Sequence, residues 1–127
     1  GPRNVMNYGH SFGHAIESAT DYKIPHGIAV TIGMDMANYV AYQLGVTSEE
    51  HFIRMHKLLD ENSSLYRKTC IESDLLLAAL VKDKKNTSDQ LRLIFPNLEG
   101  EITIGLYDKS STLEKAVQNY CEKFHSQ

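Results

Sequence analysis

Residues 27–44 constrain the fold more than any other stretch of the chain, because they are apolar nearly all round. Isoleucine, methionine and valine recur every four residues, and further apolar residues widen the stripe: Ile28, Ile32, Met36 and Val40, with Val30, Met34 and Ala37. A helix that is hydrophobic on most of its surface is buried among other elements. The pattern therefore predicts a central helix in a multihelical domain, ended by Gly45.

Amphipathic segments predict four further helices around this one. A Ser or Thr followed three residues later by Glu forms a capping box and marks two of the starts, at Thr47 and at Ser111. The expected helices span 3–20, 47–59, 75–81 with Ser73 as its cap, and a last one from Ser111 onward. The helix over 47–59 is expected to face the core with Phe52, Met55, Leu58 and Leu59.

A change of period to two follows Leu91 and predicts two strands. Leu91, Leu93 and Phe95 alternate along one segment, the turn residues 96–100 follow, and a second alternating segment carries Ile102, Ile104 and Leu106. The expected fold class is mainly α: one multihelical domain over residues 1–127 with a short β-hairpin.

Composition narrows the classes of partner. The formal net charge of −3 gives no electrostatic footprint for nucleic acid. No apolar run approaches the roughly 20 residues of a membrane span, and the N-terminus lacks a signal-peptide pattern, so a cytoplasmic protein is expected. Two cysteines without close spacing predict neither a disulfide framework nor a zinc knuckle.

The first predicted helix has a polar, reactive face. Steps of four, three and four residues place the following side chains together, with Glu17 and Asp21 extending the face: Arg3, Asn7, His10 and His14. The opposite face is apolar and suited to docking on a core: Met6, Phe12, Ala15, Ile16 and Ala19. Gly9 and Gly13 would weaken a helix by up to about 1 kcal/mol each, so they indicate close approach of a ligand or of another backbone.

Three histidines could act together. The residue before a proline is disfavoured in a helix, so Ile24, before Pro25, is expected to be extended. His26 is therefore expected at the start of the central helix. His10 and His14 could both bind one metal ion or one substrate, and His26 could complete the cluster. The alternative is a set of surface or capping histidines. Residues 82–85, Lys-Asp-Lys-Lys, could likewise be a solvated helix end or a site for a carboxylate or phosphate.

The segment from Arg3 to Glu17 resembles the signature of the dehydroquinate synthase family. Its sequence is Arg-Asn-Val-Met-Asn-Tyr-Gly-His-Ser-Phe-Gly-His-Ala-Ile-Glu, against the family's arginine, two residues and Leu-Asn-x-Gly-His-Thr-Phe-Gly-His-Ala-Ile-Glu. The His-Gly-x-Ala-Val of residues 26–30, the Asp-Lys-Lys of residues 83–85 and the strand after Leu91 resemble later family segments in the same order. Ile28 departs from the family's usual glutamate, and the segment after Lys85 lacks the usual glycine.

The resemblance implies a helical C-terminal domain whose NAD-binding α/β partner domain lies outside this chain. It implies that His10 and His26 are ligands of Zn²⁺, or of Co²⁺ in its place, with a glutamate from the other domain as the third. It implies that His14 serves catalysis and binds near the substrate phosphate, that Arg3 and Asn7 bind substrate, and that Lys84 or Lys85 holds the substrate carboxylate.

The implied activity is that of a phosphate-eliminating lyase of the shikimate pathway, leading to aromatic amino acids. A heptulosonate 7-phosphate would be cyclised through transient oxidation with NAD, and the isolated domain would be inactive. Two alternatives stay open: a related sugar-phosphate cyclase of secondary or polysaccharide metabolism, and a non-catalytic helical module that binds a metal or an anion. A homodimer is compatible with either enzyme, and neither a membrane nor nucleic acid is expected as a partner.

Overall fold

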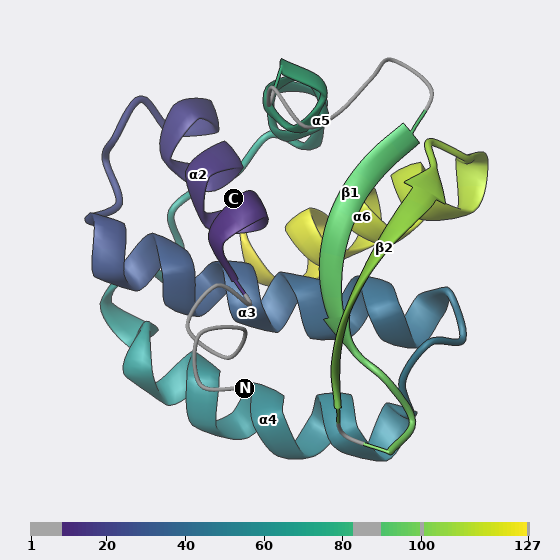
Figure 1. Cartoon of the computed structure of the whole chain (residues 1–127). Coiled ribbons are helices and arrows are strands. Elements are labelled where there is room, and N and C mark those ends of the chain that lie inside the picture. The colour runs from purple at the N-terminus through teal and green to yellow at the C-terminus, as the bar shows by residue number, and fades with distance from the viewer. Residues whose placement is uncertain (1–8, 83–89, 100, 127) are drawn as a thin grey trace.

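The computed structural model describes residues 9–82, 90–99 and 101–126. Within these ranges the chain forms five α-helices, one short 3-10 helix and one antiparallel hairpin (Figure 1). The elements are α2 (His10–Ala19), α3 (His26–Gln43), α4 (Glu49–Asn62), η1 (Ser64–Tyr66), α5 (Ser73–Lys82), β1 (Gln90–Pro96), β2 (Ile102–Asp108) and α6 (Ser111–Phe124). The expected mainly helical fold with a short hairpin is confirmed.

Helix α3 is the centre of the domain, as its apolar pattern predicts. Every residue from Asp35 to Ala41 is buried. Figure 1 shows α3 crossing the middle of the molecule, with α2 and α5 above it, α4 below and α6 behind, and the hairpin lying across its right-hand half. The helix ends before Gly45, whose φ of +78° is the left-handed conformation that glycine adopts readily.

The hairpin buries only one face. Leu91, Leu93 and Phe95 of β1 are fully buried in the core, and in the antiparallel register they lie opposite Tyr107, Gly105 and Thr103 of β2. The alternate residues of β2 therefore face outward, and Ile104 and Leu106 are 50% and 64% exposed. The register determines which face of each strand reaches the core.

Two helix caps lie one residue away from the predicted positions. Ser48, not Thr47, caps α4: its backbone is extended and its hydroxyl accepts a hydrogen bond of 3.0 Å from the His51 backbone N–H. Ser110 caps α6 in place of Ser111, accepting from the Leu113 backbone N–H at 3.2 Å. At the start of each helix two neighbouring residues carry a hydroxyl, Thr47 and Ser48 at α4, and Ser110 and Ser111 at α6. The residue with the extended backbone is the one that caps.

The bounds of two helices differ from the prediction. Helix α4 continues to Asn62, three residues beyond Leu59, and the segment after it forms η1. Ser73 is the first residue of α5 and does not precede it, since the Leu76 backbone N–H already donates to the Glu72 carbonyl oxygen at 3.0 Å.

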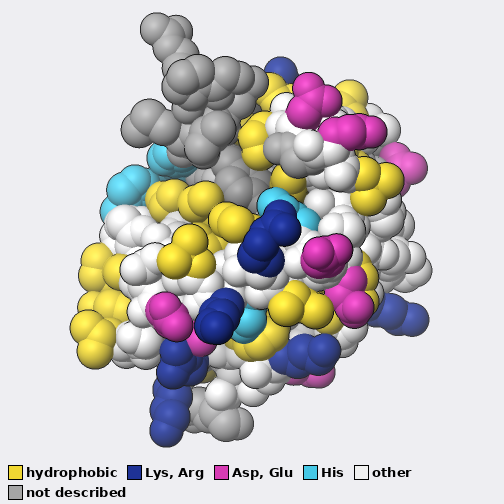
Figure 2. Space-filling model, turned by 90° about the horizontal axis from the view of Figure 1, so that it is seen from below, with side chains coloured by type: hydrophobic (Ala, Val, Ile, Leu, Met, Phe, Trp, Pro, Cys, Tyr) yellow, Lys and Arg dark blue, Asp and Glu magenta, His cyan; other side chains and the backbone are white. Residues whose placement is uncertain are grey.

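The outer side of α4 is mixed in character. Phe52 and Leu59 are buried as predicted, whereas Leu58 is 55% exposed and belongs to the outer surface. On the face that α4 covers, Figure 2 shows basic, acidic and hydrophobic side chains interspersed rather than gathered by type. No helix in the described ranges combines the length and the hydrophobicity needed to cross a membrane. Both cysteines are free thiols, Cys70 exposed and Cys121 buried.

Helix α2 begins at His10, not at Arg3. Gly9 precedes the helix with φ −104° and ψ 5°, and the residues before it lie outside the described ranges. After Ala19 the chain leaves the helix through Asp21 and Tyr22, whose φ angles of 53° and 60° are both left-handed. Asp21 therefore does not continue the polar face of α2.

The glycines of α2 are explained by another backbone. A Cβ on Gly13 would lie 3.1 Å from the Val30 Cα, and one on Gly9 would lie 2.6 Å from the Val30 carbonyl oxygen. Gly33 of α3 lies opposite these two glycines: a Cβ there would collide with the Gly9 carbonyl oxygen and lie 2.7 Å from the Gly13 nitrogen. Three glycines thus let α2 and α3 touch backbone to backbone, and this contact sets where their histidines meet.

Candidate functional site: a histidine cluster on a buried glutamate

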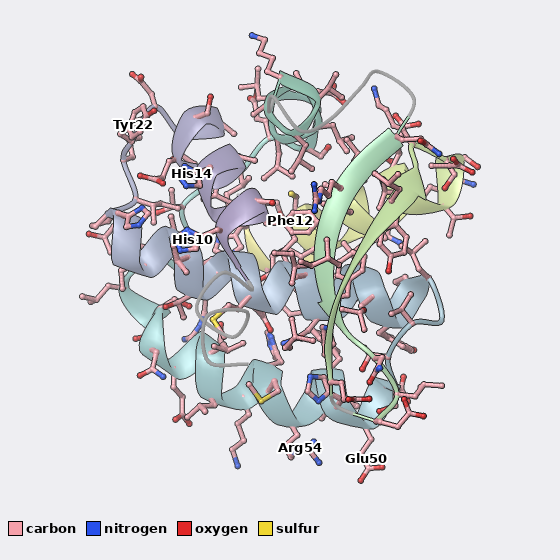
Figure 3. All side chains as sticks on the ribbon, viewed as in Figure 1. His10, Phe12, His14, Tyr22, Glu50 and Arg54 are labelled. Carbon is pink, nitrogen blue, oxygen red and sulfur yellow. The ribbon has the colours of Figure 1, made fainter. Side chains whose placement is uncertain are left out.

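Three histidines from two helices come together where α2 lies against the start of α3. His10 and His14 occupy one side of α2, one turn apart, with Phe12 on the opposite side toward β1 (Figure 3). His26 is the first residue of α3, as predicted. The ring centroids are 5.6 Å apart for His10 and His14, 5.8 Å for His10 and His26, and 5.9 Å for His14 and His26. The sequence prediction of a cluster is confirmed as a spatial arrangement.

Glu17 lies beneath this cluster. Its side chain is only 12% exposed, and its Oε1 accepts a hydrogen bond of 3.0 Å from the His26 Nδ1. The same oxygen lies 3.9 Å from the His14 Nδ1. The sequence placed Glu17 on the polar face of the helix but assigned it no role. Its three-residue spacing from His14 is the signal that links the two, whereas its bond to His26 depends on the crossing of the helices.

The surroundings of His10 favour its neutral form. Burial lowers the pKa of the His10 imidazole below its ordinary value, and the nearby His14 and His26 lower it further, against a smaller opposing effect of Glu17. A neutral imidazole keeps a lone pair on one ring nitrogen, which is the form that binds a metal ion.

A cavity adjoins the cluster on the side of α5. It has a volume of about 390 Å³ and is lined by Ser11, His14, Ala15, Ser18, Ala79, Leu80 and Lys82. The His14 side chain is 67% exposed and borders this cavity. A molecule held there would meet the imidazole of His14, two hydroxyl groups and one ammonium group.

Four of the predicted site residues lie outside the described ranges: Arg3, Asn7, Lys84 and Lys85. Their predicted roles in binding substrate stay predictions. Of the predicted residues that the structure describes, His10, His14 and His26 are brought together.

The donors present suit a borderline metal ion but do not form a complete site. Imidazole nitrogen is a good ligand for Zn²⁺ and Co²⁺, and His26, with its Nδ1–H held by Glu17, offers Nε2 as the free donor. Among the described residues, no three or more His, Cys, Asp or Glu side chains are placed together so as to hold a metal ion. His10 and His26 therefore fit a site that takes a further ligand from elsewhere.

A second buried polar group was not predicted. Asp35 lies in the middle of the apolar helix α3, and its Oδ2 accepts 2.7 Å hydrogen bonds from the His56 Nδ1 and from the Tyr120 hydroxyl. His125 is also buried, with its Nδ1 3.1 Å from the Thr69 carbonyl oxygen. The sequence pattern assigns no role to either histidine. A charged residue inside an apolar stripe was the available signal for the Asp35 network.

A family model and two related sequences all point to the same family. The family model "3-dehydroquinate synthase C-terminal" matches residues 1–86. A 3-dehydroquinate synthase of Helicobacter pylori (strain P12) is 33% identical over 119 residues, which are 93% of this chain and 35% of the relative. One of Rippkaea orientalis is 40% identical over 107 residues, 82% of this chain and 29% of the relative. The chain thus spans about a third of the length of these relatives.

A solved structure shares the fold. A crystal structure of 2-deoxy-scyllo-inosose synthase, complexed with carbaglucose-6-phosphate, NAD⁺ and Co²⁺, superposes with a TM-score of 0.71 at 24% identity, covering 91% of this chain and 34% of that one. This likeness shows that the helical arrangement and the hairpin occur together in another protein. With the family model matching well over half of its residues, the chain belongs to the 3-dehydroquinate synthase C-terminal family.

Proposed function

We propose that this chain is the substrate- and metal-binding domain of a sugar-phosphate cyclase. In this proposal a heptulosonate 7-phosphate is cyclised with loss of phosphate, in the manner of 3-dehydroquinate synthase. An NAD-binding α/β domain adjoins the 127 residues and completes the active site. The observation that carries the proposal is the convergence of His10, His14 and His26 on one surface above Glu17.

Each described residue has a role that its surroundings support. His10, neutral and partly buried, and His26, oriented through its Nδ1, are the metal ligands. His14 is the more exposed neighbour and borders the cavity, which supports assigning it the exchange of protons with a bound substrate. The bound metal supplies polarisation of the substrate hydroxyl to be oxidised, and NAD supplies the hydride acceptor.

The residues outside the described ranges complete the proposal. Arg3 and Asn7 bind the substrate, and a lysine of the pair Lys84 and Lys85 holds its carboxylate. The basic side chain that the structure does describe nearby, Lys82, lines the cavity beside His14. Cations on this side of α2 would hold the anionic ends of a sugar phosphate in register with the reacting carbons.

The test is an assay of the full-length protein for phosphate release. NAD, Zn²⁺ or Co²⁺ and a panel of heptulose 7-phosphates, with and without a carboxylate, would be supplied. Turnover of the carboxylated substrate alone supports a dehydroquinate synthase activity. Turnover of a substrate without a carboxylate supports a related cyclase, and no turnover of any member with all cofactors present contradicts the proposal.

Variants separate the roles of the histidines. His10→Ala and His26→Ala are expected to weaken Co²⁺ binding at least about tenfold, whereas His14→Ala is expected to lower turnover and leave Co²⁺ affinity nearly unchanged. His51→Asn serves as the control, because it removes a histidine on α4, outside the cluster. A metal-binding module without catalysis would show the same metal data with no phosphate release from any variant or from the wild type.

A further inference from the structure

Glu17 is the most buried charged side chain in contact with the histidine cluster. It lies on α2 one turn after His14, and its side chain is only 12% exposed. Its Oε1 has one short partner, the His26 Nδ1 at 3.0 Å, and one more distant partner, the His14 Nδ1 at 3.9 Å. A buried charge is costly unless it is paired, so the carboxylate needs a role that fixes it there.

The chemistry of the contact determines the tautomer of His26. An ionised carboxylate only accepts hydrogen bonds, so the His26 Nδ1 must carry the hydrogen that joins it to Glu17. In the neutral ring the lone pair then lies on Nε2. Without such a partner, a histidine whose side chain is 56% exposed would sample both tautomers and several ring orientations.

We propose that Glu17 is a positioning residue for the metal centre, which orients His26 and fixes Nε2 as its donor. The inference rests on the proposed function, because it takes His26 as a ligand. Carboxylates that hold the second ring nitrogen of a ligand histidine raise its basicity and remove the cost of orienting the ring on binding. Glu17 connects the two helices at the same time, because it binds a residue of α3 from α2.

The contact is specific to His26 among the three rings. His14 is 3.9 Å from the same oxygen, beyond an ordinary hydrogen bond, and no bond between Glu17 and His10 is present in the described part of the chain. Removal of Glu17 should therefore change the tautomer of His26 and leave the tautomers of the other two rings nearly unaffected. This selectivity distinguishes positioning from a general loss of structure.

Two variants and a control test the proposal in the full-length protein. Glu17→Met keeps a similar volume without an acceptor, and Glu17→Gln keeps a carbonyl oxygen that can accept from Nδ1–H. Glu49→Gln is the control, since it removes one negative charge at an exposed carboxylate, bonded to Tyr42, on the far side of α3. The readouts are the tautomer of His26 by ¹⁵N NMR of the metal-free protein and the affinity for Co²⁺ by titration.

The expected results form a graded series. Glu17→Met should convert His26 to a mixture of tautomers and weaken Co²⁺ binding about 10- to 100-fold. Glu17→Gln should keep the Nδ1–H form and recover most of that loss, and Glu49→Gln should match the wild type. An unchanged His26 tautomer in Glu17→Met, or an equal loss of Co²⁺ affinity in the Met and Gln variants, would overturn the proposal.

These experiments distinguish a failure of the proposed cyclase function from a failure of the role proposed for Glu17. A protein that releases no phosphate from any sugar phosphate, yet shows the graded tautomers and affinities, contradicts the cyclase and supports the role of Glu17. If Glu17→Met does not fold, the Gln variant still decides, because a mixed His26 tautomer in it would contradict positioning by the side-chain oxygen.

Discussion

Tyr120 donates a hydrogen bond of 2.7 Å to the Oδ2 of Asp35, across 85 residues of sequence and in the buried interior. The bond ties α6 to α3, and His56 of α4 donates to the same oxygen at 2.7 Å. Burial and the neighbouring Asp35 raise the pKa of the Tyr120 hydroxyl well above its ordinary value, so it remains a donor throughout the physiological range. Three helices thus share one buried carboxylate.

Removing the Tyr120 hydroxyl should destabilise the domain. Among the described residues, Tyr120→Phe leaves Asp35 with His56 as its single side-chain donor, and we expect a loss of about 1–3 kcal/mol in the free energy of unfolding. Tyr42→Phe is a matched control, because the Tyr42 hydroxyl donates to Glu49 over the same 2.7 Å on the surface. Urea unfolding should show a change below about 0.5 kcal/mol for the control. Equal losses in the two variants would contradict the importance of burial.

His56 should make the stability depend on pH. The hydrogen bond to Asp35 raises the pKa of His56, against the lowering effect of burial, and Asp60 raises it while Arg67 lowers it. A raised pKa in the folded state means that the stabilising charge is fully present below the unfolded value of about 6.5 and is lost as the pH rises through the folded value. The contribution of His56 should therefore fall as the pH rises above about 6.5.

The variant His56→Gln isolates this effect from the other histidines. Burial lowers the pKa of His51 and of His125, and those groups favour folding as the pH rises, with the opposite sign. The difference in unfolding free energy between wild type and His56→Gln should be largest at low pH and shrink at higher pH. Urea unfolding at several pH values measures it, and a difference that grows with pH would refute the assignment.

Periodicity predicted the elements, because it records what each segment buries. The apolar helix α3, the apolar side of α2 and the alternation of the hairpin strands were all visible in the sequence. The caps were displaced by one residue because Thr47 and Ser48 are both competent to cap, and only the backbone conformation at Ser48 decides between them. Likewise, Asp35 is a charged residue inside an apolar stripe, and nothing in the sequence around it identifies its partners His56 on α4 and Tyr120 on α6.

The histidine cluster was predictable in part for the same reason. The four-residue spacing of His10 and His14 places them on one side of a helix whatever it packs against. Their approach to His26, and the bond between His26 and Glu17, depend on how closely α2 and α3 cross. That distance is set by Gly9, Gly13 and Gly33, whose purpose the sequence left open between a ligand and a backbone.

Gly33→Ala should therefore be strongly destabilising. Its Cβ would meet backbone atoms of α2, namely the Gly9 oxygen and the Gly13 nitrogen, which cannot move aside as a flexible side chain can. We expect a loss of at least about 3 kcal/mol or a displaced α2. Gly27→Ala is the control in the same helix, because nothing lies within 4 Å of its Cβ and alanine should add up to about 1 kcal/mol of helix stability. Thermal unfolding distinguishes the two, and a neutral Gly33→Ala would contradict the close crossing.

The turn that ends α2 should gain from a glycine. Tyr22 has a φ of 60° and its side chain is 70% exposed. The left-handed backbone is therefore unfavourable for this residue, and its side chain packs too little to compensate. Its backbone N–H donates to the Glu17 carbonyl oxygen at 2.8 Å, so this turn also holds the residue that orients His26. Tyr22→Gly should stabilise the domain by about 0.5–1 kcal/mol, whereas Tyr22→Ala removes the same ring, keeps the strain and should give no such gain. Urea unfolding of the pair decides, and an equal change in both would show that the ring, not the backbone, sets the stability of the turn.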